Sequence, residues 1–574
     1  MTRADYTAEP VGLPYDLRLG VTGHRAIADG PALAAAVAAL LDRIAATLDT
    51  PSSPLACTLV SPLAQGADRL VARAALDRLH AKLEVVTPFP LATYRADFES
   101  ADDRAEFEAL LEHAAVVHEL PGVTPGAAAA TISAVQRRDT AYARVGERVV
   151  DACEILIAVW NGRRAAGLGG TADIIDHALR LERLVIWIHA ERPHVSPRII
   201  RHITYATATS EEAIVDAVAL PSSARELSIG YHQQAAYFND GSVRNEDVRT
   251  RAVGVRETFT GAARAAGVPP EALAGIFDAI VPEFVRADAL ALRYQRRHVW
   301  VVNGILRLAA LAAVTMAVGQ VLFFPEHLWL SVFEVAAMAA VFGLWWGSRG
   351  GAWHEKWLHD RYLAEQLRAA MFTVLVGPPG DARNERTLVF YRLPKHWLIH
   401  IGHTIAQEAR HRVPSIPIDS LRRVIVDGWL LDQQRFHSRK AHRKAQQAHR
   451  RHQLGFGLFA ATLLMALLHM LGVGHRDAQN LTGLDPGVWI TFFALVLPVW
   501  AGAVHAITSQ LELERVAERS ARVSSALAGL AQRAGRALTP EELAETAREA
   551  SALMLQETHA WWVLLSFQGA RLHV

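Results

Sequence analysis

Short apolar runs alternate with amphipathic stretches over the first third of the chain. Six of these runs are apolar nearly throughout, as buried strands are: LRLGV, LACTLVS, LEVVTPF, AAVVHEL, EILIAVW and LVIWIH. Between them apolar residues recur at helical spacing, as over Ala32–Leu48 and Ala67–Leu79. Apolar strands that alternate with helices are typical of a mainly parallel sheet covered on both faces. We therefore expect a flexible N-terminus over residues 1–14 and a doubly wound, Rossmann-like α/β domain over residues 15–190.

The pattern changes after residue 190, where the strand-like runs fade and helical segments rich in Ala, Glu and Arg take over. We expect a linker over residues 191–230 and an all-α membrane region beyond it. Four transmembrane helices are expected in two hairpins, the first in region 231–411 and the second in region 412–574. Each segment has about the 20 residues that a helix needs to cross a bilayer core: 299–324, 328–347, 454–473 and 488–507. The alternative, buried helices of a large soluble protein, fits two tight pairs less well.

Charge predicts the orientation of these hairpins. The chain as a whole is nearly neutral, at +1, and gives no indication of a nucleic-acid partner. Lys and Arg gather where the hairpins begin and end, and the third segment is preceded by RFHSRKAHRKAQQAHRRH, which has no acidic residue. The positive-inside rule then predicts a multi-pass protein of the inner (plasma) membrane with both termini cytoplasmic. Two lone cysteines and an N-terminus without an apolar, signal-like core agree with a cytoplasmic α/β domain.

The two hairpins have the marks of a duplication. The tripeptide RRH precedes the first segment of each, ending at His298 and at His452. An Ala-Glu pair follows each hairpin, with Glu365 lying 67 positions after His298 and Glu518 lying 66 after His452. We interpret the region as a repeated helix–hairpin–helix unit, although basic flanks alone are common to inner-membrane hairpins.

Glycine-rich turns follow the first, second and fifth predicted strands. They read GVTGHR, SPLAQGADRL and WNGRRAAGLGGTADII. In an open parallel sheet these turns meet at one edge, where glycines allow close backbone approach and helix starts bind anions. A plain turn explains any one of them, but three together predict a pocket for a nucleotide-derived ligand. The candidate binding residues are Gly20, Thr22, Gly23, His24, Arg25, Gln65, Gly66, Asp68, Asn161, Gly162, Gly169, Gly170 and Thr171.

These segments, with TPFP and CEILIAVWNG, resemble the SLOG superfamily in the branch that has a Gly-His-Arg motif. The region after about residue 230, with WLHDRYLAEQLR, resembles the SLATT two-transmembrane effector modules. The resemblance implies a sensor of a nucleotide-derived signal joined to a membrane effector in bacterial antiviral or conflict defence. No other cofactor is implied.

One departure from the superfamily bears on catalysis. Its phosphoribohydrolases, the lonely-guy enzymes, resemble PGGxGTxxE, but this chain has GLGGTADII, with Ile174 at the position of the glutamate. Isoleucine cannot act as a general acid or base, and Asp173 lies one residue early on another helix face. A binding role is therefore expected, with a membrane-tethered nucleotide-cleaving hydrolase as the alternative and no catalytic residue assigned.

Two ionisable residues lie inside the first hairpin, Arg307 and Glu334. Charge within a bilayer is costly and usually functional, although an arginine near the surface can also snorkel to it. The segments have so few polar residues that a path across the membrane would require a homo-oligomer. We find no metal motif, because the histidines before the third segment do not share one helix face, and that basic helix is expected to meet anionic lipid headgroups.

Overall fold

The computed structural model describes residues 13–50, 53–98, 100–121, 133–165, 167–207, 209–322, 328–377, 396–473, 486–510 and 512–569. The chain forms two compact units. The first comprises Met1–Gly241 and Asp381–Ile401, and the second comprises Ser242–Gly380 and Gly402–Val574. Most of the expected flexible N-terminus and both hairpin links, 323–327 and 474–485, lie outside the described residues.

An eight-stranded mixed sheet forms the centre of the first unit, with strand order β4-β3-β2-β1-β5-β6-β7-β8. The strands β1 to β6 are parallel and coincide with the six apolar runs, so this part of the sequence prediction is confirmed. Their bounds are Tyr15–Gly23, Leu55–Ser61, Lys82–Thr87, Ala114–Glu119, Ile155–Trp160 and Leu184–His189.

Two further strands correct the expected linker over 191–230. β7 (Arg198–Tyr205) pairs antiparallel with β6, and β8 (Ala213–Ala219) pairs antiparallel with β7. Most positions of both strands are exposed or partly buried, β7 burying only Ile199 and Ile200 and β8 only Ala217, and β8 is an edge. A half-exposed edge strand needs no continuous apolar run, which is why the pattern that identified β1 to β6 missed these two.

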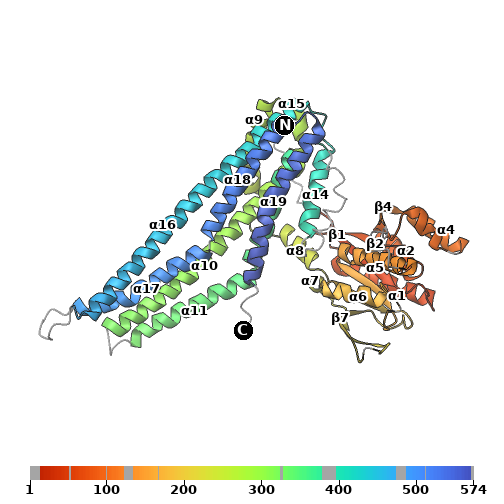
Figure 1. Cartoon of the computed structure of the whole chain (residues 1–574), viewed down its shortest axis with the longest axis horizontal. Helices are drawn as coiled ribbons and strands as arrows, with labels where there is room; N and C mark the ends of the chain where they lie inside the picture. The colour runs from red at the N-terminus through yellow and green to blue at the C-terminus, as the bar shows by residue number, and fades with distance from the viewer. Residues whose placement is uncertain are drawn as a thin grey trace. The chain divides into compact units, whose positions relative to one another are not determined.

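Helices cover both faces of this sheet (Figure 1). α1 (Gly30–Leu48) and α2 (Ala67–Leu79) pack together, and α2 lies on β1 to β3. α5 (Ala134–Ala152) and α6 (Thr171–Arg180) pack together on the opposite face, over a core that includes the fully buried Trp160. The smaller helices of this unit are α3 (Leu91–Tyr94), α4 (Ala101–Leu111), α7 (Ala224–Leu227) and α8 (Ile229–Phe238).

Long helices make up the second unit, and several of them run side by side in Figure 1. α10 packs against α11, α12 and α17, and α16 packs against α17 and α18. Their bounds, with those of the shorter α9, α14 and α15, are α9 (Asn245–Ala266), α10 (Val281–Leu322), α11 (Leu328–Gly350), α12 (Trp353–Thr373), α14 (His396–Arg410), α15 (Ile418–Ile425), α16 (Leu431–Met470), α17 (Pro486–Gln510), α18 (Leu513–Arg536) and α19 (Pro540–Gly569).

Five helical segments of the described chain are long and apolar enough to cross a membrane. Four of them overlap the expected spans, in α10, α11, α16 and α17, and their apolar windows are at most 11% buried. The fifth is α1, whose six buried residues pack within the α/β unit. Length and composition therefore indicate that the protein associates with a membrane. The high hydropathy of α1 comes instead from its alanines and from the apolar residues that it buries in the core of the α/β unit.

The second unit contains the same succession of elements twice. A single π-helical turn precedes α10 at Ile276–Ile280 and precedes α16 at Val426–Leu430. A hairpin helix follows each long helix, and α12 and α18 each begin after a residue in the left-handed conformation, Ala352 and Glu512. His298 contacts His354 between α10 and α12, with ring centroids 4.5 Å apart, and His452 pairs with Glu514 between α16 and α18.

These matching contacts support the repeat but change its alignment. His354 and Glu514 each lie two residues after the left-handed residue, so they are equivalent positions. Glu365 lies thirteen residues after Ala352, whereas Glu518 lies six residues after Glu512. The two Ala-Glu pairs are therefore two helical turns out of register and do not mark equivalent positions.

Candidate functional site

The chain order of the sheet reverses between β1 and β5, which are neighbours in space. β1 to β4 extend the sheet on one side of this point, and β5 to β8 extend it on the other. Ligands of open α/β sheets bind at such a point, beyond the carboxyl ends of the strands. The three glycine-rich turns start there, because they follow β1, β2 and β5.

The glycines of the first two turns bring the end of β1 against the start of α2. A side chain at Gly23 would lie 2.5 Å from the Cβ atom of Ala67, and a side chain at Gly66 would collide with the backbone carbonyl of Arg25. Gly66 also has a φ of +85°, which other residues rarely adopt. The Ala67 N–H donates to the His24 carbonyl over 3.1 Å, so the two turns form one rigid surface.

His24 links this surface to the turn after β5. Its Nε2 atom accepts a hydrogen bond from the backbone N–H of Asn161 over 3.1 Å. Accepting at Nε2 requires the neutral ring, with its proton on Nδ1. The Asn161 side chain closes its own turn, because Oδ1 accepts from the Arg163 N–H over 3.1 Å. Both residues thus hold the switch point together, and the His24 Nδ1–H is a donor that this bond leaves unused.

Arg25 is exposed and lies over an aromatic ring that sequence analysis missed. Its guanidinium carbon is 5.0 Å from the ring centroid of Tyr142, on α5. The Tyr142 hydroxyl binds Asp97, which also pairs with Arg138, and Phe89 packs edge-on to the Tyr142 ring at 6.0 Å. A cation, two aromatic rings and an acid–base pair therefore border the predicted pocket. No sequence motif predicted these neighbours of Arg25, because α5 lies more than 100 residues after the first turn.

Asp68 is a buried carboxyl group at the start of α2. Burial raises its pKa to about 7, while a backbone hydrogen bond with Ala64 and the charges of Arg25 and Arg69 act in the opposite direction. A carboxylate in the first turn of a helix often only complements the helix dipole, but burial makes Asp68 a group that titrates near neutrality. Perturbed carboxyl groups of this kind are frequent at functional sites.

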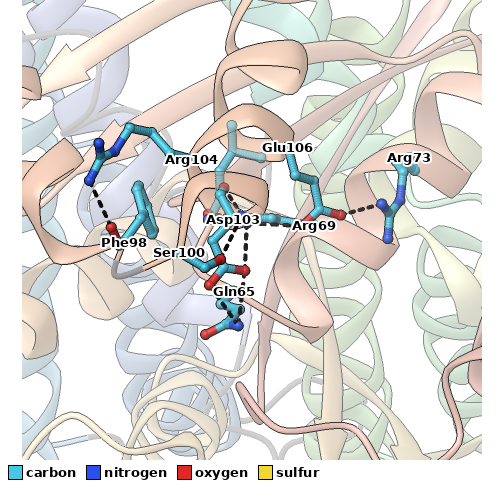
Figure 2. Close-up of polar contacts among 9 residues, drawn as sticks. Gln65, Arg69, Arg73, Phe98, Ser100, Asp103, Arg104 and Glu106 are labelled. Carbon is cyan, nitrogen blue, oxygen red and sulfur yellow. Dashed lines mark hydrogen bonds and ion pairs between the residues drawn. The ribbon is translucent and has the colours of Figure 1, made fainter.

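Gln65 and Arg69 tie the second turn to α4, as Figure 2 shows. The Gln65 amide donates to the carboxylate of Asp103 over 3.0 Å, so this predicted ligand residue already has a partner. Arg69 is fully buried, donates to the Asp103 carbonyl and to Glu106 over 2.9 Å each, and stacks on Phe98. Its Nη2 has no hydrogen-bond partner among the described residues. The ion pairs stiffen this side of the site.

The turn after β5 divides into two parts with different surroundings. Gly162 faces the antiparallel edge, where its carbonyl accepts from the Ala213 N–H of β8 over 2.8 Å. Gly169, with a φ of +78°, packs closely on Ala143 of α5, and its N–H donates to Asp173 over 3.1 Å. Asp173 thus closes its own turn. Gly170 is the N-cap of α6 and has no side-chain cap, so the start of α6 at Thr171 remains the anion-binding feature of this turn.

Ile174 is a core residue. It is 3% exposed and packs on Gly146 of α5, where any side chain on the glycine would overlap it. A carboxylate at this position would point into the packed layer between α5 and α6. The packing of α5 against α6 therefore favours an apolar side chain at the position where the enzymes have a glutamate.

Three predicted residues are not part of this cluster: Gly20 packs inside the sheet, and Arg307 and Glu334 belong to the second unit. Gly20 is inside β1, and a side chain there would lie 2.7 Å from the Cys153 sulfur, so it serves packing against the end of α5. Arg307 is exposed on α10, and Glu334 is partly buried on α11. Within the described ranges, no group of three His, Cys, Asp or Glu side chains is arranged to hold a metal ion.

Comparison with known protein families and with curated proteins finds no match to this chain. The chemistry of the site therefore rests on its residues. Thr22, Arg25, the ring of His24 and the start of α6 offer donors to an anionic ligand, and Tyr142 offers an aromatic surface beside them.

Proposed function

We propose that the first unit senses a nucleotide-derived signal and that the apolar helices of the second unit respond by perturbing the membrane. The observation that carries this proposal is the joining of three turns at the switch point by the His24–Asn161 and His24–Ala67 hydrogen bonds. This arrangement supports a preorganised anion site, because its donors are held by backbone contacts and need no ligand to assemble. The cationic and aromatic side chains beside it suit a phosphate and a base or ribose.

The resemblance to SLOG and SLATT proteins supports a role in bacterial antiviral or conflict defence, in an inner-membrane homo-oligomer with both termini cytoplasmic. Four spans with few polar residues would need several copies to enclose a path for ions.

The test is binding without turnover by the purified full chain in detergent. The full chain is required because Gln234 of α8 donates to the Leu13 carbonyl over 2.7 Å and Tyr231 bonds Thr50, so a fragment that ends before α8 would lose part of the unit. NAD⁺, ADP-ribose and cyclic mono- and dinucleotides serve as probes in equilibrium dialysis. We expect one class to bind and to be recovered intact by chromatography, and Arg25→Ala to weaken its binding about ten- to a hundredfold. Failure of every probe to bind would contradict the sensor.

One observation favours the alternative, a nucleotide-cleaving hydrolase. Asp68 has a pKa of about 7, which suits a general acid or base at neutral pH. Its burial beneath the first turn of α2 argues against contact with a ligand unless the turn moves. Release of base or ribose over many turnovers, abolished in Asp68→Asn, would establish the hydrolase in place of the sensor.

A further inference from the structure

The basic half of α16 carries its charges on two different faces. α16 is one continuous helix whose last two-fifths, from Leu454, are apolar and largely exposed. The preceding half has seven Lys and Arg residues, and its last acidic residue is Asp432. Four of them, Arg435, Arg439, Arg443 and Arg450, are exposed, as expected of a solvated helix. The remaining charges require another explanation.

Lys440, Lys444 and Arg451 lie on the inner face of α16. Their spacing of four and seven residues places them within about 40° of one another around the helix axis. All three are partly buried, and His437, one turn earlier on this face, is fully buried. Burial, followed by the charges of Lys440, Arg451 and Arg443, lowers the pKa of Lys444. Positively charged side chains are thus close together at a place where burial limits how far water can screen their repulsion.

Two acidic residues of the described chain near this face, Glu365 and Glu514, already have cations. Glu365 of α12 pairs with Arg361 and Arg368 before it meets Lys440 and His437. Glu514 of α18 lies 3.0 Å from His452. Arg451 has a buried Nη1 atom with no hydrogen-bond partner among the described residues. A buried cationic donor without a protein partner is costly unless a water molecule or an anion binds it.

α18 supplies one more polar group at the same level. Ser520 is fully buried, and its hydroxyl also has no hydrogen-bond partner within the described chain. Along α18 it lies between Ser524, which donates to the Gln434 carbonyl, and Glu514, which meets His452. Lys444 lies between Gln434 and His452 on the facing α16. Ser520 therefore lies opposite the middle of the basic half of α16, near the level of Lys444 and not of Arg451.

We propose that Lys444 and Arg451 of α16, with Ser520 of α18 near the Lys444 end, form a binding site for an anion of the phosphate class. The site belongs to the second unit and does not depend on the function proposed for the first unit. Two sources can supply such an anion. Arg451 lies three residues, about 4.5 Å of helix rise, before the apolar segment, within reach of a lipid headgroup. Lys444 lies ten residues before it, about 15 Å, where a soluble phosphate is the nearer source.

The experiment compares Lys444→Gln with Arg443→Gln in the full chain. The two positions are adjacent, and each variant removes one positive charge, but Arg443 is on the exposed face. For the soluble source, the thermal midpoint of detergent-solubilised protein is followed while inorganic phosphate replaces chloride at constant ionic strength. For the lipid source, native mass spectrometry counts phosphatidylglycerol retained by delipidated protein, with phosphatidylcholine as the neutral comparison. Arg451→Gln is measured in both arms.

We expect the wild type and Arg443→Gln to bind equally in one arm, and Lys444→Gln and Arg451→Gln to bind about tenfold or more weakly there. A response to phosphate assigns the soluble source, and selective retention of phosphatidylglycerol assigns the headgroup. The proposal is overturned if neither arm shows binding, or if Arg443→Gln loses as much as Lys444→Gln, since the effect would then be general attraction to a basic helix. Circular dichroism of each variant establishes that lost binding is not lost folding. If Lys444→Gln does not fold, the wild-type titration and the Arg451→Gln variant decide.

Discussion

At the scale of single residues, the carboxyl edge of the sheet contains groups whose roles come from burial. Gly23 and Gly66 are required by close backbone packing, and Asp68 is held in a poorly solvated position between that packing and Arg69. Substituting either glycine to block a ligand would therefore disturb the fold first. Arg25 is the cleaner probe of binding, because it is exposed.

We expect Gly66→Ala to lower the free energy of unfolding of the first unit by about 2–4 kcal/mol. A φ of +85° is strained for alanine, and the new methyl group would meet the backbone carbonyl of Arg25, which cannot move aside as a side chain can. Chemical denaturation measures the change. Gly30→Ala is the matched control, because no atom lies within 4 Å of its added carbon, and it should change stability by about 0.5 kcal/mol or less. Equal effects of the two substitutions would contradict the packing argument.

Asp68 predicts a pH dependence of stability. Its folded pKa of about 7 lies above its ordinary value of 3.8, so the ionised form is penalised in the folded state. The free energy of unfolding therefore carries no penalty from Asp68 below about pH 4, and it falls as the pH rises through 7 and the carboxyl ionises. Asp68→Asn cannot ionise and should gain about 2–3 kcal/mol relative to the wild type between pH 5 and pH 8. Unfolding curves of both proteins at the two pH values provide the measurement, and a difference that does not vary with pH would show that the carboxyl is not penalised.

At the scale of elements, helices of similar hydropathy have different surroundings. α1 has its apolar stripe buried within the α/β unit, whereas the apolar half of α16 exposes large residues such as Leu454, Phe456 and Phe459 on several sides. Composition alone groups these helices together as five candidate spans. Burial distinguishes α1 from the other four.

A lysine placed on each helix tests this distinction. Ala35→Lys, at an exposed position of α1, should leave the amount of protein in the membrane fraction unchanged. Leu463→Lys, in the apolar half of α16, should reduce that amount, since a lysine at the centre of a span costs about 2.5–3.5 kcal/mol on insertion. The comparison requires membrane fractionation of the two variants at equal expression. Loss of membrane protein with Ala35→Lys would instead make α1 a fifth span.

At the scale of the whole molecule, the proposed function requires the two units to be coupled. A ligand shifts an equilibrium only by its different affinities for the two states, so the loss of binding must remove the membrane response. The duplicated hairpins offer an element with two matching halves, each joined at its base by a contact between the long helix and the helix that follows the hairpin.

Arg25→Ala should lose both nucleotide binding and nucleotide-dependent depolarisation, whereas Glu334→Leu should keep binding and change depolarisation. The first substitution removes a cation at the proposed ligand site, and the second removes a partly buried carboxyl from α11. Proteoliposomes loaded with a potential-sensitive dye give the response to the probe that binds. Depolarisation that persists in an Arg25→Ala protein unable to bind would show that the pocket does not control the membrane helices.

The sequence by itself determined the six parallel strands, their order of appearance and the four long apolar segments outside the sheet. These features are local: a strand buried on both faces is a continuous apolar run, and a span is about 20 apolar residues. The three glycine turns were predicted on the same basis, because each follows a strand. The duplication was also visible, although its alignment by the Ala-Glu pairs was two turns out of register.

Only the tertiary structure decided what lies beside these elements. The half-exposed strands β7 and β8 depend on pairing with β6, and no apolar run marks them. The burial of Asp68, the approach of Tyr142 to Arg25 and the inward face of Lys444 depend on residues distant in the sequence. Burial and electrostatic environment are properties of the space around a side chain, and packing between distant segments creates that space.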